Sequence, residues 1–298
     1  MELSNTIKKR FVNDFNIPIN IFEEKIFLER LEQFNLTFKS KNKYNFLTET
    51  IKKLGSEKDF FDESDRIIKT IQEYIKKSEK YKELQQNELT EYSKFIKDTK
   101  NKYKFNKNLY TEQNIGKYFI SIDLKEANFN TFKNMNILNF KDYKEFIETF
   151  TNYDYFKESK QIRQIVFGHL LPKKQTIIQE YEICKIIEKI QLNKNGVIIL
   201  NKDEVVFEVN KDFDLETIMN LKLSNFPLRI EKFKLIELRD KKDTLYFIKD
   251  YGNKKELKSV PKIYYIQAYK KMMNIKIEDN DLIFFYEGFP AKFIESVF

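Results

Sequence analysis

The chain of 298 residues is 41% hydrophobic and 34% charged, a composition typical of a globular protein of one large domain or two small ones. A single cysteine, Cys184, excludes an intrachain disulfide and a cysteine-cluster zinc site, and a single histidine, His169, nearly excludes a histidine-rich metal site. The net charge of +8 is compatible with a polyanionic partner but is spread along the sequence. Without an apolar run of about twenty residues or an apolar signal core, we expect an intracellular protein, cytoplasmic or in another internal compartment, and no membrane contact.

The first part of the chain, residues 1–112, is predicted to be a helical N-terminal region. Helices are expected over residues 22–34 and 47–54. A long charged stretch, residues 59–101, carries apolar side chains on one stripe in its first half and is mostly polar in its second half. We interpret this stretch as a solvated helical hairpin, with a dedicated binding arm as the alternative.

From residue 115 the pattern alternates between strands and helices. Strands are expected over residues 118–122, 197–200, 205–209 and 227–235, with helical segments at 128–135, 139–152, 157–190 and 215–221. The order β–α–β–β–α–β is that of a split-βαβ, ferredoxin-like antiparallel sheet. We therefore predict an α+β fold in which the helical region is followed by a sheet-forming core, residues 113–240, and a β-rich C-terminal extension, residues 241–298.

Acidic residues follow the first strand and lie in the turn between the next two. Asp123 ends the first strand, and Asp203 and Glu204 belong to the polar turn at residues 201–204. The first strand and the first strand of the hairpin are expected to be neighbours, so these carboxylates should meet. Paired carboxylates suit Mg²⁺ or Mn²⁺ in phosphoryl or nucleotidyl transfer. Asp123 as a helix cap and residues 201–204 as an ordinary turn remain the alternatives.

Three segments resemble motifs of template-dependent nucleic-acid polymerases. Residues 197–209 (VIILNKDEVVFEV) are similar to the third palm motif of family A DNA polymerases, with Lys202 where that family usually has histidine. Residues 120–128 (ISIDLKEAN) resemble the first palm motif of that family and of reverse transcriptases. Between them, residues 159–168 (SKQIRQIVFG) are similar to the family A fingers helix, with Arg163 in place of its lysine. The three segments follow one another in the order of the family.

The resemblance implies a role for each matching residue. Asp123 and Asp203 would hold the metal ions, with Glu204 secondary, and Arg163 would touch the incoming nucleoside triphosphate because a guanidinium fork suits phosphate. Asn128, five residues after Asp123, would lie beneath the sugar. Lys174, which follows Pro172, is a further candidate for gripping phosphate. The alternatives are that Arg163 and Lys174 are solvated helix residues and that Asn128 is a helix N-cap.

The C-terminal extension contains a second basic segment. Residues 257–264 (LKSVPKIY) resemble a segment near the thumb of viral polymerases, where basic and aromatic residues meet the primer. Lysine contacts phosphate and tyrosine stacks on bases or sugars. The candidate nucleic-acid-binding residues are therefore Lys254, Lys255, Lys258, Lys262 and Tyr264, with a plain surface hairpin as the alternative.

The resemblance as a whole implies a metal-dependent nucleotidyltransferase with a palm-like core and a thumb-like extension. It would add nucleotides to a nucleic-acid primer on a template, as in DNA replication, with Mg²⁺ or Mn²⁺ as cofactor. One alternative is a catalytically inactive palm-fold accessory factor that binds nucleic acid, and another is an interaction protein without a nucleic-acid role. Asp123 and Asp203 close together and open to solvent would argue against the last.

Overall fold

The computed structural model describes residues 2–192, 196–286 and 289–298 of the chain. It confirms the predicted α+β fold with a helical N-terminal region and an antiparallel sheet. The helices of the N-terminal region are α1 (Asn5–Asp14), α2 (Glu24–Gln33), α3 (Asn35–Phe38), α4 (Ser40–Leu54), α5 (Glu57–Lys76), α6 (Glu79–Gln86) and α7 (Thr90–Lys102). None of the described helices is long and apolar enough to cross a membrane.

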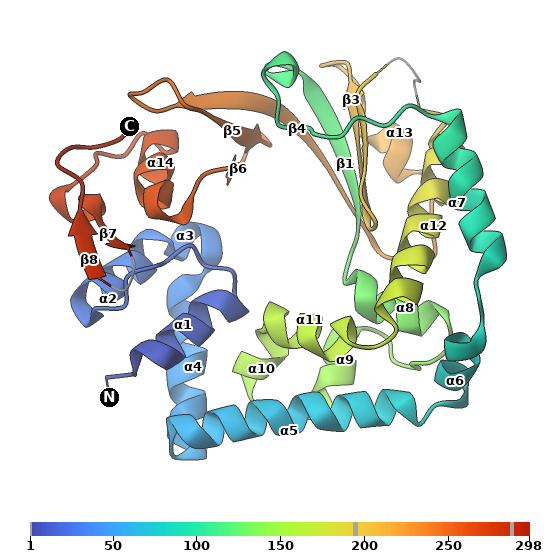
Figure 1. Cartoon of the computed structure of the whole chain (residues 1–298), viewed down its shortest axis with the longest axis horizontal. Helices are drawn as coiled ribbons and strands as arrows, with labels where there is room; N and C mark the ends of the chain where they lie inside the picture. The colour runs from blue at the N-terminus through green and yellow to red at the C-terminus, as the bar shows by residue number, and fades with distance from the viewer. Residues whose placement is uncertain (1, 193–195, 287–288) are drawn as a thin grey trace.

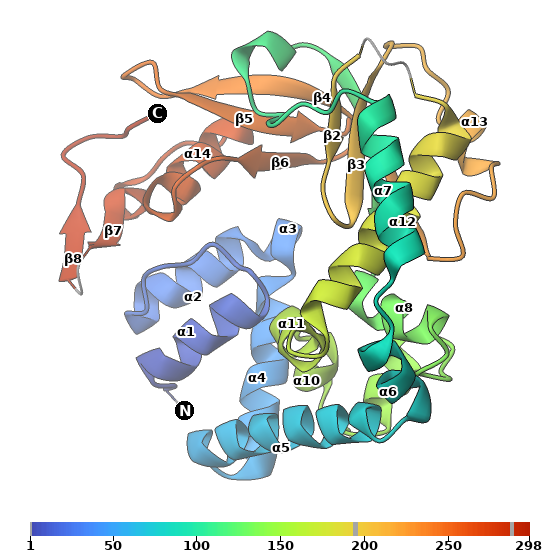
Figure 2. The same cartoon turned by 45° about the vertical axis from the view of Figure 1, so that its right-hand side comes forward.

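The long charged stretch does not form a helical hairpin, so that prediction was wrong. The start of α5 is capped by Ser56, whose side chain accepts from the Asp59 N–H, and its apolar stripe is buried at Phe60, Ile67 and Ile71. Helix α5 runs along the bottom of the molecule against α11 (Lys160–Gly168), whereas α7 packs on α12 (Pro172–Ile190) (Figures 1 and 2). The two helices separate because each buries its own apolar face against a different partner.

The described residues form one six-stranded antiparallel sheet with the order β2-β3-β1-β4-β5-β6. Its strands are β1 (Tyr118–Leu124), β2 (Ile198–Leu200), β3 (Glu204–Val209), β4 (Leu228–Arg239), β5 (Leu245–Asp250) and β6 (Lys255–Lys258). Helices α8 (Ala127–Asn134), α9 (Tyr143–Glu148), α10 (Asp154–Glu158), α11 and α12 lie between β1 and β2, and α13 (Glu216–Met219) lies between β3 and β4. The order of the first four strands is that of the split-βαβ arrangement.

One neighbour relation in the sheet differs from the prediction. Strand β1 pairs with β3, the second strand of the hairpin, and β2 lies outside β3 at the edge. The crossover through the helices makes β1 and β2 parallel and leaves a strand's width between them. Strand β3 is antiparallel to both and fills this space with hydrogen bonds on each side.

The two faces of the sheet are covered differently. Ile120 and Ile122 of β1 belong to the large core with the apolar side chains of α8 and α12. On the other face, Phe119 packs with Phe233 and with Leu109 from the segment before β1. Because side chains alternate along a strand, Asp123 projects on this second face, beyond the edge of its smaller core.

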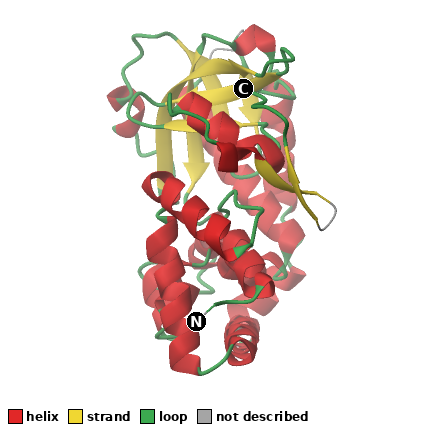
Figure 3. Cartoon of the chain, turned by 90° about the vertical axis from the view of Figure 1, so that its left-hand side faces the viewer, coloured by secondary structure: helices red, strands yellow, loops and turns green. Residues whose placement is uncertain are grey.

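The C-terminal extension continues the sheet and then returns to the N-terminal helices. Strand β5 pairs with β4, and β6 pairs with β5, so the expected boundary at residue 240 falls inside the sheet. Helix α14 (Tyr265–Met272) was not predicted; it is followed by a hairpin of β7 (Ile283–Tyr286) and β8 (Phe289–Lys292). The Tyr269 ring of α14 lies 5.2 Å from that of Phe34. Figure 3 views this side, with the sheet above the N-terminal helices.

Candidate functional site

The end of β1 lies beside the turn that contains Asp203. Asp123 is directly opposite Glu204 in the β1–β3 register, and the Leu124 N–H donates to the Asp203 carbonyl oxygen at 2.9 Å. The side chains of Asp123 and Asp203 both line a cleft of about 740 Å³. The sheet therefore brings together two acidic positions that are far apart in the sequence.

Asp123 is a half-buried carboxylate with an unusual electrostatic environment. Burial, together with the negative charges of Asp203 and Glu204, raises the pKa of Asp123 to about 6, although the Arg229 guanidinium acts in the opposite direction. Arg229 Nη2 donates to Asp123 Oδ2 at 2.9 Å. Asp123 is not a helix cap, since α8 begins at Ala127 after a left-handed Glu126. Its carboxylate is thus held at the cleft without a structural task in the backbone.

Glu204 projects on the same face of the sheet as Asp123 but does not line the cleft. Its carboxylate accepts from Ser121 Oγ at 2.6 Å and from Asn201 Nδ2 at 3.1 Å. Lys249 Nζ lies 4.0 Å from the same carboxylate and 4.5 Å from the centre of the Phe233 ring. Glu204 therefore adds a negative charge near the two aspartates, while its carboxylate is bound by Ser121, Asn201 and Lys249.

Arg163 and Asn128 line the same cleft as the aspartates. Arg163 Nη1 is 3.1 Å from Glu126 Oε1, and its guanidinium lies 5.1 Å from the centre of the Tyr143 ring. Asn128 is the second residue of α8 rather than its N-cap, and its Oδ1 accepts from Gln179 Nε2 at 2.9 Å. Four of the residues selected from the sequence therefore converge on one cleft.

Lys174 is placed elsewhere and has a structural role. Its ammonium donates to the backbone carbonyls of Leu84 and Gln85 at 2.8 Å each, and to that of Asn87. The last carbonyl groups of a helix have no hydrogen-bond partner within the helix. Lys174 of α12 lies beside the C-terminus of α6 and donates to these carbonyl groups. Lys174 does not line the cleft, so the structure does not bring it together with the other candidate residues.

The candidate residues of the C-terminal segment divide between two environments. Lys255, Lys258 and Lys262 line a second cavity, between β6, α14 and the N-terminal helices. Lys254 instead pairs with Glu231 at 2.7 Å, and the ring of Tyr264 lies 5.5 Å from that of Phe293. Neither Lys254 nor Tyr264 lines either of these two cavities.

Two further residues of the cleft were missed from the sequence. Arg229 is the second residue of β4 and stands opposite Asp123 in the β1–β4 register. The predicted strand order contained this signal, because it makes the fourth strand a neighbour of the first. Lys160 of α11 also lines the cleft and lies within the fingers-like segment, three residues before Arg163. Both add positive charge to the lining of the cleft.

The cleft offers oxygen ligands but not a closed metal cage. Within the described ranges, no three acidic, cysteine or histidine side chains are grouped closely enough to hold a metal ion by themselves. Asp123 and Asp203 fit a Mg²⁺ ion that keeps several waters and takes its other ligands from phosphates. Burial is the largest cause of the raised pKa of Asp123, and the charges of Asp203 and Glu204 add to it, so a bound cation would favour the ionised carboxylate.

Comparison of the chain with protein-family models, with curated proteins and with solved structures finds no match. The fold and the cleft are therefore the evidence on which a function can be argued.

Proposed function

We propose that the chain is a metal-dependent nucleotidyltransferase with a palm-like core, which adds nucleotides to a nucleic-acid primer. One observation carries the proposal: Asp123, Asn128, Arg163 and Asp203, selected from three separate sequence motifs, all line one cleft at the end of a split-βαβ sheet. Two carboxylates and an arginine facing a common space suit a nucleoside triphosphate with its metal ion.

Each cleft residue has a role that its contacts support. Asp123 and Asp203 would hold Mg²⁺ or Mn²⁺, which when bound neutralises phosphate charge and orients the reacting oxygens. Arg163 would exchange its ion pair with Glu126 for the triphosphate, while its stacking on Tyr143 keeps the guanidinium in place. Asn128 would contact the sugar through its amide. Lys160 would add positive charge beside Arg163.

The proposal is tested by nucleotide incorporation on primed and unprimed templates with Mg²⁺ and Mn²⁺. The wild type should extend a primer, and Asp203→Asn should remove this activity while leaving the unfolding transition in place. Asp212→Asn is the matched control because Asp212 is exposed and lies outside the cleft. Absence of incorporation by the wild type under every condition would refute the enzymatic function.

A second candidate is a nucleic-acid-binding accessory factor that lacks catalysis. The observation in its favour is the ion pair between Arg229 and Asp123, which supplies a cation from the protein itself where the metal would bind. This function predicts that primer–template binds to the wild type without incorporation. It also predicts that Asp203→Asn leaves the binding affinity unchanged whether or not Mg²⁺ is added.

A further inference from the structure

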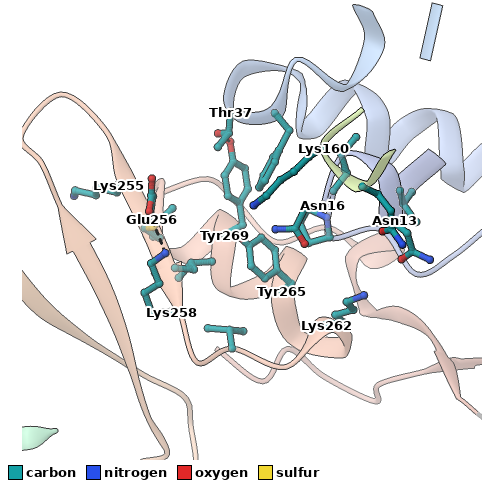
Figure 4. A pocket seen from close by; sticks show the side chains of 18 of the residues that line it. Asn13, Asn16, Thr37, Lys160, Lys255, Glu256, Lys258, Lys262, Tyr265 and Tyr269 are labelled. Atoms are coloured by element: carbon teal, nitrogen blue, oxygen red, sulfur yellow. Dashed lines mark hydrogen bonds and ion pairs between the residues drawn. The ribbon is translucent and has the colours of Figure 1, made fainter. Parts of the chain in front are cut away.

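A second cavity of about 740 Å³ lies between the two ends of the chain. One side is formed by β6 and α14, the other by the end of α1, the residues after it and α3, and α11 contributes between them (Figure 4). Its lining includes several lysines and asparagines and two tyrosines. This combination of charged, amide and aromatic side chains suits a ligand that carries negative charge, hydrogen-bonding groups and flat rings.

The charge on the cavity wall is strongly positive. The charged lining residues are four lysines, Lys160, Lys255, Lys258 and Lys262, and one glutamate, Glu256. Glu256 is engaged by Lys258 at 3.1 Å. Among the described residues, no carboxylate pairs with the other three lysines, which are exposed. Unpaired ammonium groups that share one cavity favour an anion with several charges, because each charge then finds its own partner.

Uncharged groups face these lysines. Figure 4 shows Lys255 and Lys258 on one side of the cavity and Asn13 and Asn16 on the other, with the tyrosine rings between them. Tyr269 is held in place by its hydroxyl, which lies 2.9 Å from Thr37 Oγ1. Amides can hydrogen-bond the edges of bases, and aromatic rings can stack on their faces.

The cavity borders the cleft at Asp123, because Lys160 and Gln164 of α11 line both spaces. A chain-like ligand that follows the lysines of the cavity would pass Lys160 on its way to the two aspartates. A compact ligand such as a free nucleotide would not need this connection.

We propose that this cavity binds a single-stranded nucleic acid and leads it to the Asp123 cleft. This inference deepens the proposed nucleotidyltransferase function. The delivery of the strand to the Asp123 cleft rests on that function, whereas binding in the cavity does not. The lysines would hold the phosphates, and the amides and the partly exposed ring of Tyr265 would meet the bases, whereas Tyr269 is buried and forms the floor of the cavity. A duplex fits less well, because its paired bases hide the faces and edges that these groups would contact.

The test measures binding of a fluorescently labelled oligodeoxythymidylate to the full chain by anisotropy, without metal and over a range of salt concentrations. The double variant Lys255→Glu with Lys262→Glu should bind roughly tenfold or more weakly, and its salt slope should be smaller by about 1.4, the value for two lost single-strand phosphate contacts. Lys94→Glu with Lys97→Glu makes the same change of charge at two exposed positions on α7 and should bind like the wild type.

Three outcomes would overturn the proposal. They are equal weakening in both double variants, unchanged affinity in the cavity variant, and tighter binding of a duplex of the same length than of the single strand. A matching unfolding temperature in all proteins shows that the variants are folded. Asp203→Asn keeps the two failures apart, because it should lose incorporation and bind the single strand as the wild type does. If Asp203→Asn loses incorporation but the cavity variant binds the single strand as tightly as the wild type does, the cavity proposal fails and the nucleotidyltransferase proposal stands.

Discussion

Arg229 donates a hydrogen bond to Asp123 at 2.9 Å across two neighbouring strands, so that a guanidinium faces the carboxylate proposed to hold the metal ion. The side chain of Arg229 is 57% exposed and that of Asp123 only 21%, which makes the arginine the movable partner. Arg229 also lies 3.6 Å from Glu231 on its own strand. The guanidinium can therefore leave Asp123 without losing every carboxylate partner.

Replacement of Arg229 by alanine should strengthen metal binding. The guanidinium and a metal ion compete for the same carboxylate oxygens, so Arg229→Ala is expected to lower the dissociation constant for Mn²⁺ by up to about fivefold, the equivalent of the ~1 kcal/mol of a half-exposed ion pair. Titration calorimetry at pH 8, where Asp123 is ionised, measures this. Arg239→Ala is the control, since Arg239 lies at the other end of β4 and pairs with Glu112 and Glu237. Equal dissociation constants in wild type and Arg229→Ala would mean that Asp123 is not a metal ligand.

The raised pKa of Asp123 should appear as a pH-dependent cost in stability. A carboxyl group whose pKa is higher in the folded state, here about 6 against an ordinary 3.8, binds its proton more tightly when folded. Stability therefore falls as the pH rises from 3.8 to about 6, and the full cost is present above pH 6. The groups responsible besides burial are Asp203 and Glu204, with Arg229 opposing them. Asp123→Asn should therefore raise the free energy of unfolding at pH 7.5, by at most roughly 3 kcal/mol.

This gain should shrink as the pH falls from 6 to 4, because the wild-type carboxyl group becomes protonated in the folded state and little of the cost remains near its ordinary pKa of 3.8. Urea unfolding of the wild type and Asp123→Asn at pH 7.5 and at pH 4 measures the difference in the free energy of unfolding. Asp212→Asn, an exposed change of the same type, should show little difference at either pH. A gain of the same size at pH 4 and pH 7.5 would show that it does not come from ionisation of Asp123.

Asn128→Tyr should shift nucleotide preference towards deoxynucleotides. Under the proposed function Asn128 contacts the sugar, and a bulky ring at this position would clash with a 2′-hydroxyl. The substitution also breaks the hydrogen bond from Gln179, which Gln179→Ala breaks without filling the cleft. Steady-state incorporation of paired ribo- and deoxynucleotides should change its ratio in Asn128→Tyr and not in Gln179→Ala. A constant ratio in all three proteins would remove Asn128 from the sugar site.

Asp281 should be essential for joining the C-terminal extension to the N-terminal helices. It is buried between Arg30 of α2 at 2.6 Å and Lys270 of α14 at 2.5 Å. Asp281→Ala leaves two buried cations unpaired and should cost about 3–5 kcal/mol in urea unfolding. Asp279→Ala removes only the surface pair with Lys292 and should cost less than ~1 kcal/mol.

The pH dependence of this contact follows from the pKa of Asp281. Burial acts to raise it, but hydrogen bonds from Lys270 and from the Glu278 N–H, together with Arg30, outweigh burial and lower it. The stabilisation is therefore present above the ordinary pKa of aspartate and is lost as the pH falls through the lowered value. In Asp281→Ala this acid-dependent loss should be absent, and a loss as large as in the wild type would assign it to other groups.

Much of the fold was predictable because it depends on local pattern. The β-branched and aromatic run at Tyr118–Leu124 and the apolar run at Ile198–Leu200 favour strands, and both form them. Their order with the helices leads to the split-βαβ arrangement and places Asp123 near the turn at Asp203. Helix α14 escaped prediction because its tyrosines and isoleucine also suit a strand. Helix α14 contacts β6, and it also contacts Phe34 and Thr37, which lie far from it in the sequence.

The sequence by itself determined which residue types stand at the strand ends, and hence the acidic character of the cleft. Tertiary structure decided which cations meet them. Arg229 reaches Asp123 only through the pairing of β4 with β1, and Lys174 is withdrawn only because α6 ends beside it. The cavity lined by Lys160 and Lys255 joins segments from both ends of the chain. Such contacts arise from long-range packing, whereas a local sequence pattern reports only on residues a few positions apart.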